Sequence, residues 1–188
     1  MLEQYKQIIR PLLGDKRYYH SECVAKAARE LAAKYGADEE KAETAGILHD
    51  IMKDTAPEKQ LAMMERYGIR LTPVERNAPK LWHAMLGAAY LKNELEIGDA
   101  AVLDAVRYHT TGRADMTLLD KVLFIADFIS ADRDYPGVED LRKAAGVSLE
   151  EAMIAGLSHT IADLAQARKP IHPDTVDAYN EATLGHTK

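Results

Sequence analysis

Helix-start signals recur along this sequence, while segments that alternate apolar and polar residues, as a half-buried β-strand does, are nearly absent. A Ser or Thr followed three residues later by Glu forms a capping box, which satisfies free amide groups at the start of a helix. The pattern occurs at 55–58, 72–75 and 148–151, and in the first two a proline lies inside the expected first turn. A chain of this kind predicts an all-α protein.

Apolar residues at helical spacing, together with terminating glycine and proline residues, predict roughly eight to ten helices in one compact domain over residues 1–188. The longest irregular segment is expected at 132–137. The expected helices run up to about residue 14, over 19–35, from 38 through 53, over 55–68, 72–79, 83–94, 99–109, 115–130 and 148–169, and from 174 onward.

The composition limits the classes of partner. No apolar run approaches the length that a membrane-spanning helix needs, and the first residues lack the basic-then-apolar pattern of a signal peptide. The one cysteine, Cys23, excludes an internal disulfide and a thiolate zinc cluster, which fits a reducing, cytoplasmic setting. The net charge of −6 argues against binding to a nucleic-acid polymer, but a local basic pocket could still hold a small phosphorylated substrate.

His49 and Asp50 stand side by side in an apolar, helix-like stretch between Leu48 and Ile51. Burying a charge costs several kcal/mol unless the group is paired or bound to a metal ion, so we expect other polar residues to compensate this pair. Mixed imidazole and carboxylate ligands suit iron, manganese or zinc better than calcium, and the set is large enough for one or two ions. The candidate partners are His20, His83, His109 and Asp127.

A group of basic residues accompanies these candidate ligands. Lys53 lies three residues after Asp50, and Arg17 lies three residues before His20 on its expected helix. A bound metal ion lowers the pKa of a water ligand and polarises a phosphoryl oxygen, so the combination indicates hydrolysis at phosphorus. The side chains available to neutralise phosphate oxygens are Arg17, Lys53, Arg113 and Arg133.

Each of these residues alone has a simpler explanation. A single histidine on a helix is most often a hydrogen-bonded structural residue, and Arg17 or Lys53 alone would be an ordinary surface charge. Arg133 beside Asp132 fits an ion pair within a loop. The recurrence of carboxylates in two apolar runs, together with several helix histidines, favours the metal site.

The ordered set His20, His49–Asp50 and Asp127 resembles that of the HD-domain metal-dependent phosphohydrolases. The segments 17–21, 48–54, 107–112 and 121–130 further resemble the YqeK family of bacterial symmetrical diadenosine tetraphosphate hydrolases, which split that dinucleotide into two ADP. The resemblance implies an HD core at about 15–135 and C-terminal helices at about 148–184.

The resemblance also implies roles for individual residues. An iron-type ion would be held by His20, His49, Asp50 and Asp127, with manganese or another divalent metal as alternatives. His83 and His109 would hold a second metal ion or face the substrate phosphates. The catalytic residues would be Asp50, Lys53 and His109. The implied substrate contacts are Arg17, His20, Asp50, Ile51, Met52, Lys53, His83, His109, Thr110, Asp127, Arg133, Pro170, Ile171, His172, Pro173, Asp174 and Thr175.

Two other functions compete with this interpretation. A generic nucleotide phosphohydrolase acting on monophosphates would release inorganic phosphate or a nucleoside instead of ADP. A non-catalytic nucleotide sensor would bind ADP without turnover, although the complete ligand set and the surrounding basic residues favour an enzyme. The sequence is compatible with a homodimer and with either one or two metal ions.

Overall fold

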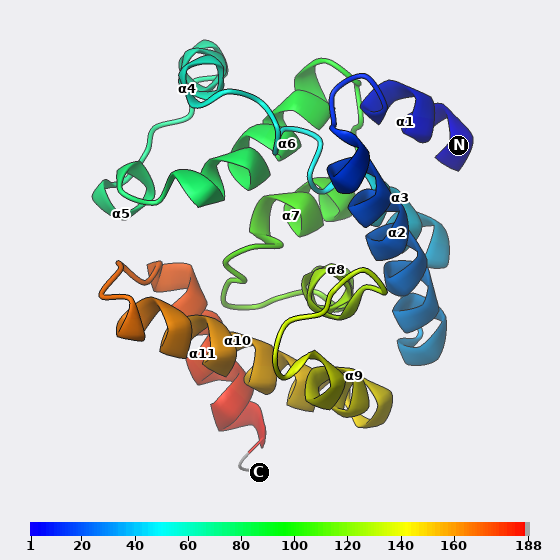
Figure 1. The fold of residues 1–188 in the computed structure, drawn as a ribbon, viewed down its shortest axis with the longest axis vertical. Coiled ribbons are helices and arrows are strands. Elements are labelled where there is room, and N and C mark those ends of the chain that lie inside the picture. The colour runs from blue at the N-terminus through cyan, green and yellow to red at the C-terminus, as the bar shows by residue number, and fades with distance from the viewer. Residues whose placement is uncertain (187–188) are drawn as a thin grey trace.

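The structure, a computed structural model, describes residues 1–186 and consists of helices joined by short loops, with no strand among those residues (Figure 1). The prediction of an all-α protein is confirmed. The α-helices are α1 (Leu2–Ile9), α2 (Asp15–Tyr35), α3 (Glu39–Leu48), α4 (Pro57–Arg66), α5 (Pro73–Arg76), α6 (Trp82–Asn93), α7 (Ala100–Tyr108), α8 (Leu118–Ile129), α9 (Val138–Val147), α10 (Leu149–Gln166) and α11 (Pro173–His186), and a short 3₁₀ helix covers Pro79–Leu81.

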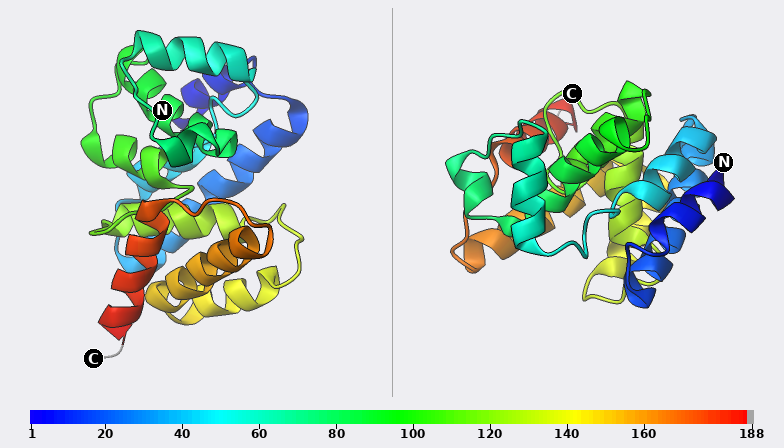
Figure 2. Two further views of the ribbon diagram at one scale, coloured as in Figure 1. Left: turned by 90° about the vertical axis from the view of Figure 1, so that its left-hand side faces the viewer. Right: turned by 90° about the horizontal axis from the view of Figure 1, so that it is seen from above.

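Helix α8 forms the centre of the molecule. It contacts α2, α3, α7, α9 and α10, and Figure 1 shows it between the blue N-terminal helices and the orange and red C-terminal pair. Its residues 122–126 are fully buried, which accounts for the strongly apolar sequence of this helix. Figure 2 shows α4 and α6 grouped at the end of the molecule opposite α10 and α11. No helix in residues 1–186 is both long and apolar enough to cross a membrane.

Helices α2 and α3 approach each other unusually closely because α3 has a glycine at the contact. A Cβ atom on Gly46 would lie 2.6 Å from Cα of Ala25, which leaves no room for a side chain. The close approach brings His20 of α2 to the end of α3, where its ring centroid is 5.3 Å from that of His49.

The expected helix through residue 53 is wrong for residues 49–53, because α3 ends at Leu48. From there the backbone continues in turns, in which Ile51 N–H donates to Leu48 O and Lys53 N–H donates to Asp50 O, at 3.1 and 2.8 Å. Gln60 stabilises the following turn, since its amide donates to backbone oxygens of this segment. His49 and Asp50 therefore lie on a turn, where their side chains can point to the same place.

The capping signals gave mixed results. Thr72 and Glu75 form the predicted capping box at α5, and the Ser148 hydroxyl accepts from a backbone amide at the start of α10. The box predicted at 55–58 is wrong, because α4 has Ala56 as its N-cap and the Thr55 hydroxyl contacts a methionine sulfur instead. Helix α9 was not predicted, nor was the capping box formed by Thr117 and Asp120 at the start of α8.

Candidate metal centre

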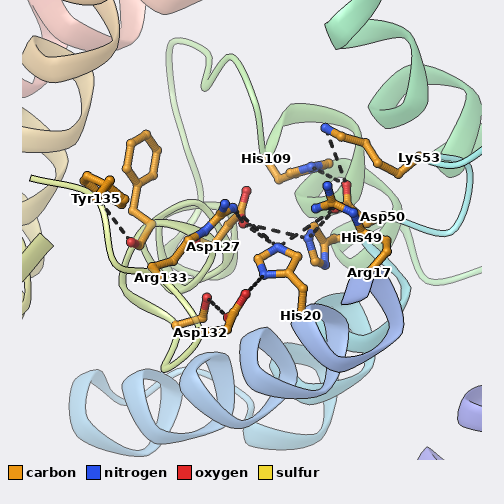
Figure 3. A network of polar contacts seen from close by, with 12 residues as sticks. Arg17, His20, His49, Asp50, Lys53, His109, Asp127, Asp132, Arg133 and Tyr135 are labelled. Carbon is orange, nitrogen blue, oxygen red and sulfur yellow. Dashed lines mark hydrogen bonds and ion pairs between the residues drawn. The ribbon is translucent and has the colours of Figure 1, made fainter. Parts of the chain in front are cut away.

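Four buried imidazoles meet where α2, α3, α6 and α7 come together, and Figure 3 shows three of them, His20, His49 and His109. His20 lies within α2 and His83 in the first turn of α6, whereas His49 and His109 are the C-cap residues of α3 and α7. The ring centroids of His49 and His109 are 5.0 Å apart, and those of His83 and His109 are 5.1 Å apart. Residues from four segments thus form one cluster.

Two carboxylates lie among these rings. Nε2 of His20 is 3.0 Å from Oδ1 of Asp127, and Nε2 of His83 is 3.0 Å from Oδ1 of Asp50. Nε2 of His49 lies 3.4 Å from Asp50 Oδ2 and 3.9 Å from Asp127 Oδ1. Three sets have all ligand atoms within 4.8 Å of one another: His20, His49 and Asp50; His49, His109 and Asp127; and Asp50, His83 and His109.

The hydrogen bonds of two imidazoles fix which nitrogen faces the carboxylates. Nδ1 of His49 lies 2.7 Å from Gly46 O, and Nδ1 of His109 lies 2.7 Å from Val106 O. A carbonyl oxygen can only accept, so both Nδ1 atoms carry the proton, and in the neutral rings both Nε2 atoms present lone pairs.

The Nε2 lone pairs and the carboxylate oxygens that they face repel each other, and a bound cation would remove this repulsion. Nε2 of His49 is buried without a hydrogen-bond partner and faces two carboxylates. Burial opposes a charge on His49, yet Asp50 and Asp127 raise its pKa. Burial likewise works against ionised Asp50 and Asp127, but nearby imidazoles hold the pKa of each carboxyl well below its usual range. Nitrogen and oxygen donors of this kind fit a divalent transition-metal ion.

Three basic side chains surround this candidate metal centre. Nη1 of Arg17 donates to Asp50 Oδ2 at 2.7 Å, and Arg133 pairs with the carboxylate of Asp127. Nζ of Lys53 lies 3.2 Å from Nε2 of His83, and burial lowers the pKa of this lysine. These contacts place three cations within reach of an anion bound at the centre.

Arg113, also expected near a phosphate, is used elsewhere. Its guanidinium bonds to Asp120 at 2.8 Å and to Asp104 at 3.2 Å, and it lies over the ring of Tyr108. The sequence expectation for this residue is therefore not supported, because its carboxylate partners belong to α7 and α8 and are not members of the candidate metal centre.

His83 differs from an ordinary surface histidine in its protonation. Burial lowers its pKa to about 4, and the attraction of Asp50 only partly offsets this effect. At neutral pH the ring is therefore uncharged.

A cavity of about 280 Å³ lies beside the loop that follows His109. Its walls include Thr110, the 77–81 segment and residues of the predicted 170–175 segment. The Thr110 hydroxyl is buried without a hydrogen-bond partner. From the 170–175 segment, the lining includes Pro170, His172 and Thr175.

Other predicted substrate contacts do not line this cavity. Ile171, Pro173 and Asp174 belong to the same segment but do not line this cavity, and α11 begins at Pro173, so that Asp174 lies in its first turn. The side chains of Ile51 and Met52 are buried in the hydrophobic core. These two residues could therefore contact a substrate only through their backbone groups.

Sequence reasoning missed one polar residue at the centre. Oδ2 of Asp132 lies 2.8 Å from Nδ1 of His20, and Ser130 donates to Oδ1 of Asp132 at 2.8 Å. Burial tends to raise the pKa of Asp132, but these two partners lower it overall. No local signal could have shown this contact, because the two residues are 112 positions apart.

Comparison with known proteins gives a consistent result. The model of the HD domain family matches residues 17–132. A Bacillus subtilis protein named symmetrical bis(5'-nucleosyl)-tetraphosphatase is 39% identical, over 97% of this chain and 98% of its own. A protein of the same name from Halalkalibacterium halodurans is 40% identical over 95% of each chain.

A solved structure agrees with these relatives. The crystal structure from Clostridium acetobutylicum, described as a predicted HD superfamily hydrolase involved in NAD metabolism, has a TM-score of 0.94 and 34% identity, and the match covers 98% of both chains. The resemblance indicated by the motifs is confirmed.

Proposed function

Because this chain belongs to the HD-domain family, we propose that it is a metal-dependent hydrolase that cleaves diadenosine tetraphosphate symmetrically into two ADP. The observation that carries the proposal is the buried cluster in which His49 Nε2 faces the carboxylates of Asp50 and Asp127. Near-full-length similarity to proteins named for this reaction supports the choice of substrate. The substrate is then a nucleotide, and the single cysteine suits a reducing, cytoplasmic setting.

The metal ligands in this proposal are His20, His49, Asp50 and Asp127. Iron is our first choice, and manganese or another divalent ion would fit the same donors. When bound, the ion supplies a Lewis acid that lowers the pKa of a water molecule and polarises a phosphoryl oxygen.

The basic side chains bind and orient the phosphate chain. Arg17 and Lys53 lie against the two carboxylate oxygens of Asp50, at 2.7 and 4.0 Å, and Arg133 pairs with Asp127, so together they can neutralise oxygens on more than one phosphate. Negative charge that develops on the non-bridging oxygens of the attacked phosphoryl group is stabilised by the same groups.

Water orientation and proton transfer fall to two further residues. Asp50 is held ionised, so its carboxylate can orient the attacking water by accepting a hydrogen bond from it. His83, whose pKa is about 4, is a poor proton donor at neutral pH, and it serves better as a neutral ligand or hydrogen-bond donor. We assign the proton for the leaving oxygen to His109, which in this step would carry a proton on Nε2 in addition to the Nδ1 proton that it donates to Val106 O.

The position of attack depends on how one nucleoside is held. The cavity beside Thr110 has an apolar wall and few polar groups, which suits a base, and the 170–175 segment closes part of it. If this cavity holds one adenosine and the next two phosphates extend to the metal centre, the cut falls at the middle of the chain. The whole of residues 1–188 would act as one unit, with Pro170, His172 and Thr175 acting through side chains and Ile171, Pro173 and Asp174 through the shape of the segment.

The test measures products and metal together. Protein purified without oxygen is assayed for bound metal and for products from diadenosine tetraphosphate, with NAD and nucleoside monophosphates as comparison substrates. We expect Asp50→Ala to lose both metal and ADP release, whereas Asp134→Ala, an exposed control, should keep both. Wild-type metal content and activity in Asp50→Ala would refute the assignment. Inorganic phosphate as the product would favour the nucleotidase alternative, and ADP binding without turnover would favour a sensor.

A further inference from the structure

The imidazoles that face the two carboxylates are anchored in different ways. His49 and His109 each donate from Nδ1 to a backbone carbonyl three residues earlier, which is a neutral acceptor within the same chain segment. His20 instead has its Nδ1 2.8 Å from a carboxylate oxygen of Asp132, from a loop on the other side of the centre. Figure 3 shows Asp132 below the His20 ring and Asp127 above it.

Asp132 is itself fixed in place. Ser130 donates its hydroxyl to the second carboxylate oxygen at 2.8 Å. The loop that carries both residues is held by Arg142, whose guanidinium donates to the backbone oxygens of Ile129, Ser130 and Arg133 at 2.8–3.0 Å. The side chain of Asp132 is only 17% exposed. Its orientation is therefore set before any ligand binds.

We propose that Asp132 is a positioning residue that holds His20 with Nε2 directed at the metal ion and increases the electron donation of that nitrogen. A carboxylate can only accept a hydrogen bond, so Nδ1 of His20 carries the proton, and in the neutral ring Nε2 presents its lone pair to a metal ion. Partners of this kind fix the tautomer and ring orientation of a metal-binding histidine and raise its basicity. Asp132 would act through His20 and would not touch the substrate.

The 130–133 loop also holds a second proposed ligand, Asp127, in place. Arg133 donates to the backbone oxygen of Asp127 at 2.8 Å and pairs with its side chain. One loop at the end of α8 thus supports two of the four proposed ligands, His20 through Asp132 and Asp127 through Arg133. Because this loop follows α8 directly, the position of both ligands depends on the last turn of that helix.

The test uses Co²⁺ alone as the probe and rests on the proposed metal site. Dissociation constants are measured by competition with a chelator, and the visible absorption spectrum of each variant is recorded at saturating Co²⁺. We expect Asp132→Ala to bind about 10- to 100-fold more weakly than wild type. Asp132→Asn keeps a neutral acceptor and should fall between the two. Both variants should show a changed Co²⁺ spectrum at saturation, which a loss of stability alone would not cause.

One control and one further variant accompany the Asp132 variants. Asp134→Asn changes an exposed carboxylate of the same loop and should bind within about twofold of wild type. Ser130→Ala leaves Asp132 in place but removes its hydroxyl partner, and it should weaken binding several-fold. If Asp132→Ala fails to fold, Asp132→Asn and Ser130→Ala decide the question.

Wild-type affinity together with a wild-type spectrum in the Asp132 variants would overturn the inference. A wild-type protein that binds no Co²⁺ or other divalent ion would instead overturn the proposed metal-dependent function, so the two failures are distinguishable.

Discussion

The close contact between α2 and α3 makes Gly46→Ala a demanding test of how the metal centre is assembled. The added Cβ would lie 2.6 Å from Cα and 2.9 Å from N of Ala25, and 3.1 Å from O of Val24. All three are backbone atoms, so no side-chain rotation can relieve the contact. Because non-bonded carbon atoms pack best at about 3.5–4.0 Å, the helices would have to separate by about 1 Å.

Two opposing effects set the size of the change. Overpacking of this kind costs about 1–3 kcal/mol, whereas Ala is favoured over Gly in a helix interior by about 1 kcal/mol. Because all three contacts are with backbone atoms, the overpacking cost lies near the upper end of its range, and we expect Gly46→Ala to lower the free energy of unfolding by about 2 kcal/mol. The same displacement would separate His20 from His49, so metal affinity should fall as well.

Urea denaturation followed by circular dichroism measures the stability, and chelator competition measures the metal affinity. Gly146→Ala is the matched control, because a Cβ at that position in α9 would meet nothing within 4 Å. The control should gain up to about 1 kcal/mol. If Gly46→Ala is as stable as wild type while the control behaves as expected, the backbone contact does not set the spacing of the two helices.

Three further predictions concern single side chains. Thr110→Val removes a buried hydroxyl that has no hydrogen-bond partner, so the free energy of unfolding should stay level or rise by about 1 kcal/mol. If the hydroxyl binds the substrate, KM for the dinucleotide should rise several-fold, and an unchanged KM would contradict a role in binding. Arg142→Met removes three hydrogen bonds to backbone oxygens and should cost about 2–3 kcal/mol in urea denaturation, and a loss under about 0.5 kcal/mol would show that this clamp is dispensable. Burial lowers the pKa of His83 from 6.5 to about 4, so as the pH falls His83 is protonated in the unfolded chain before it is protonated in the folded protein. The free energy of unfolding of the metal-free protein should therefore fall as the pH drops from 6.5 towards 4. His83→Asn should reduce that slope, and an identical pH series for both proteins would argue against a neutral, buried His83.

Helix starts could be predicted from the sequence because their chemistry is local. Asp38 was expected to cap a helix, and its carboxylate accepts from the amides two and three residues later. The Thr72 capping box works at the same short range. The polar ligands in apolar runs could also be recognised, because a carboxylate such as Asp50 is costly to bury without compensation.

The end of α3 depends on contacts that the local pattern does not contain. Apolar spacing continues past Leu48, but the segment leaves the helix and is held by Gln60, whose amide donates to the oxygens of Met52 and Thr55 at 3.0 and 2.9 Å. Asp132 was interpreted as a loop partner of Arg133 for a similar reason. Its real partner lies in a different helix, and only the packed structure brings them together.

The charges at the centre nearly cancel before any ion is added. Three carboxylates and three basic groups lie within one connected network of contacts, and His83 is neutral at pH 7. A divalent ion therefore leaves the site with a local positive surplus, although the whole chain carries a net charge of −6. The six groups are Arg17, Lys53, Arg133, Asp50, Asp127 and Asp132.

The placement of that surplus favours a ligand with several phosphates. Arg17 and Lys53 lie beside Asp50, whereas Arg133 lies beside Asp127, so the three cations are divided between the two carboxylates of the centre. A monophosphate could meet only some of them, whereas a chain of phosphates could meet all three. ADP should therefore bind the metal-loaded protein more tightly than AMP, by at least about tenfold if one additional charge-assisted contact is worth about 1.5 kcal/mol. Calorimetric titrations that gave equal affinities would mean that only one phosphate is recognised, which is the behaviour of a nucleotidase.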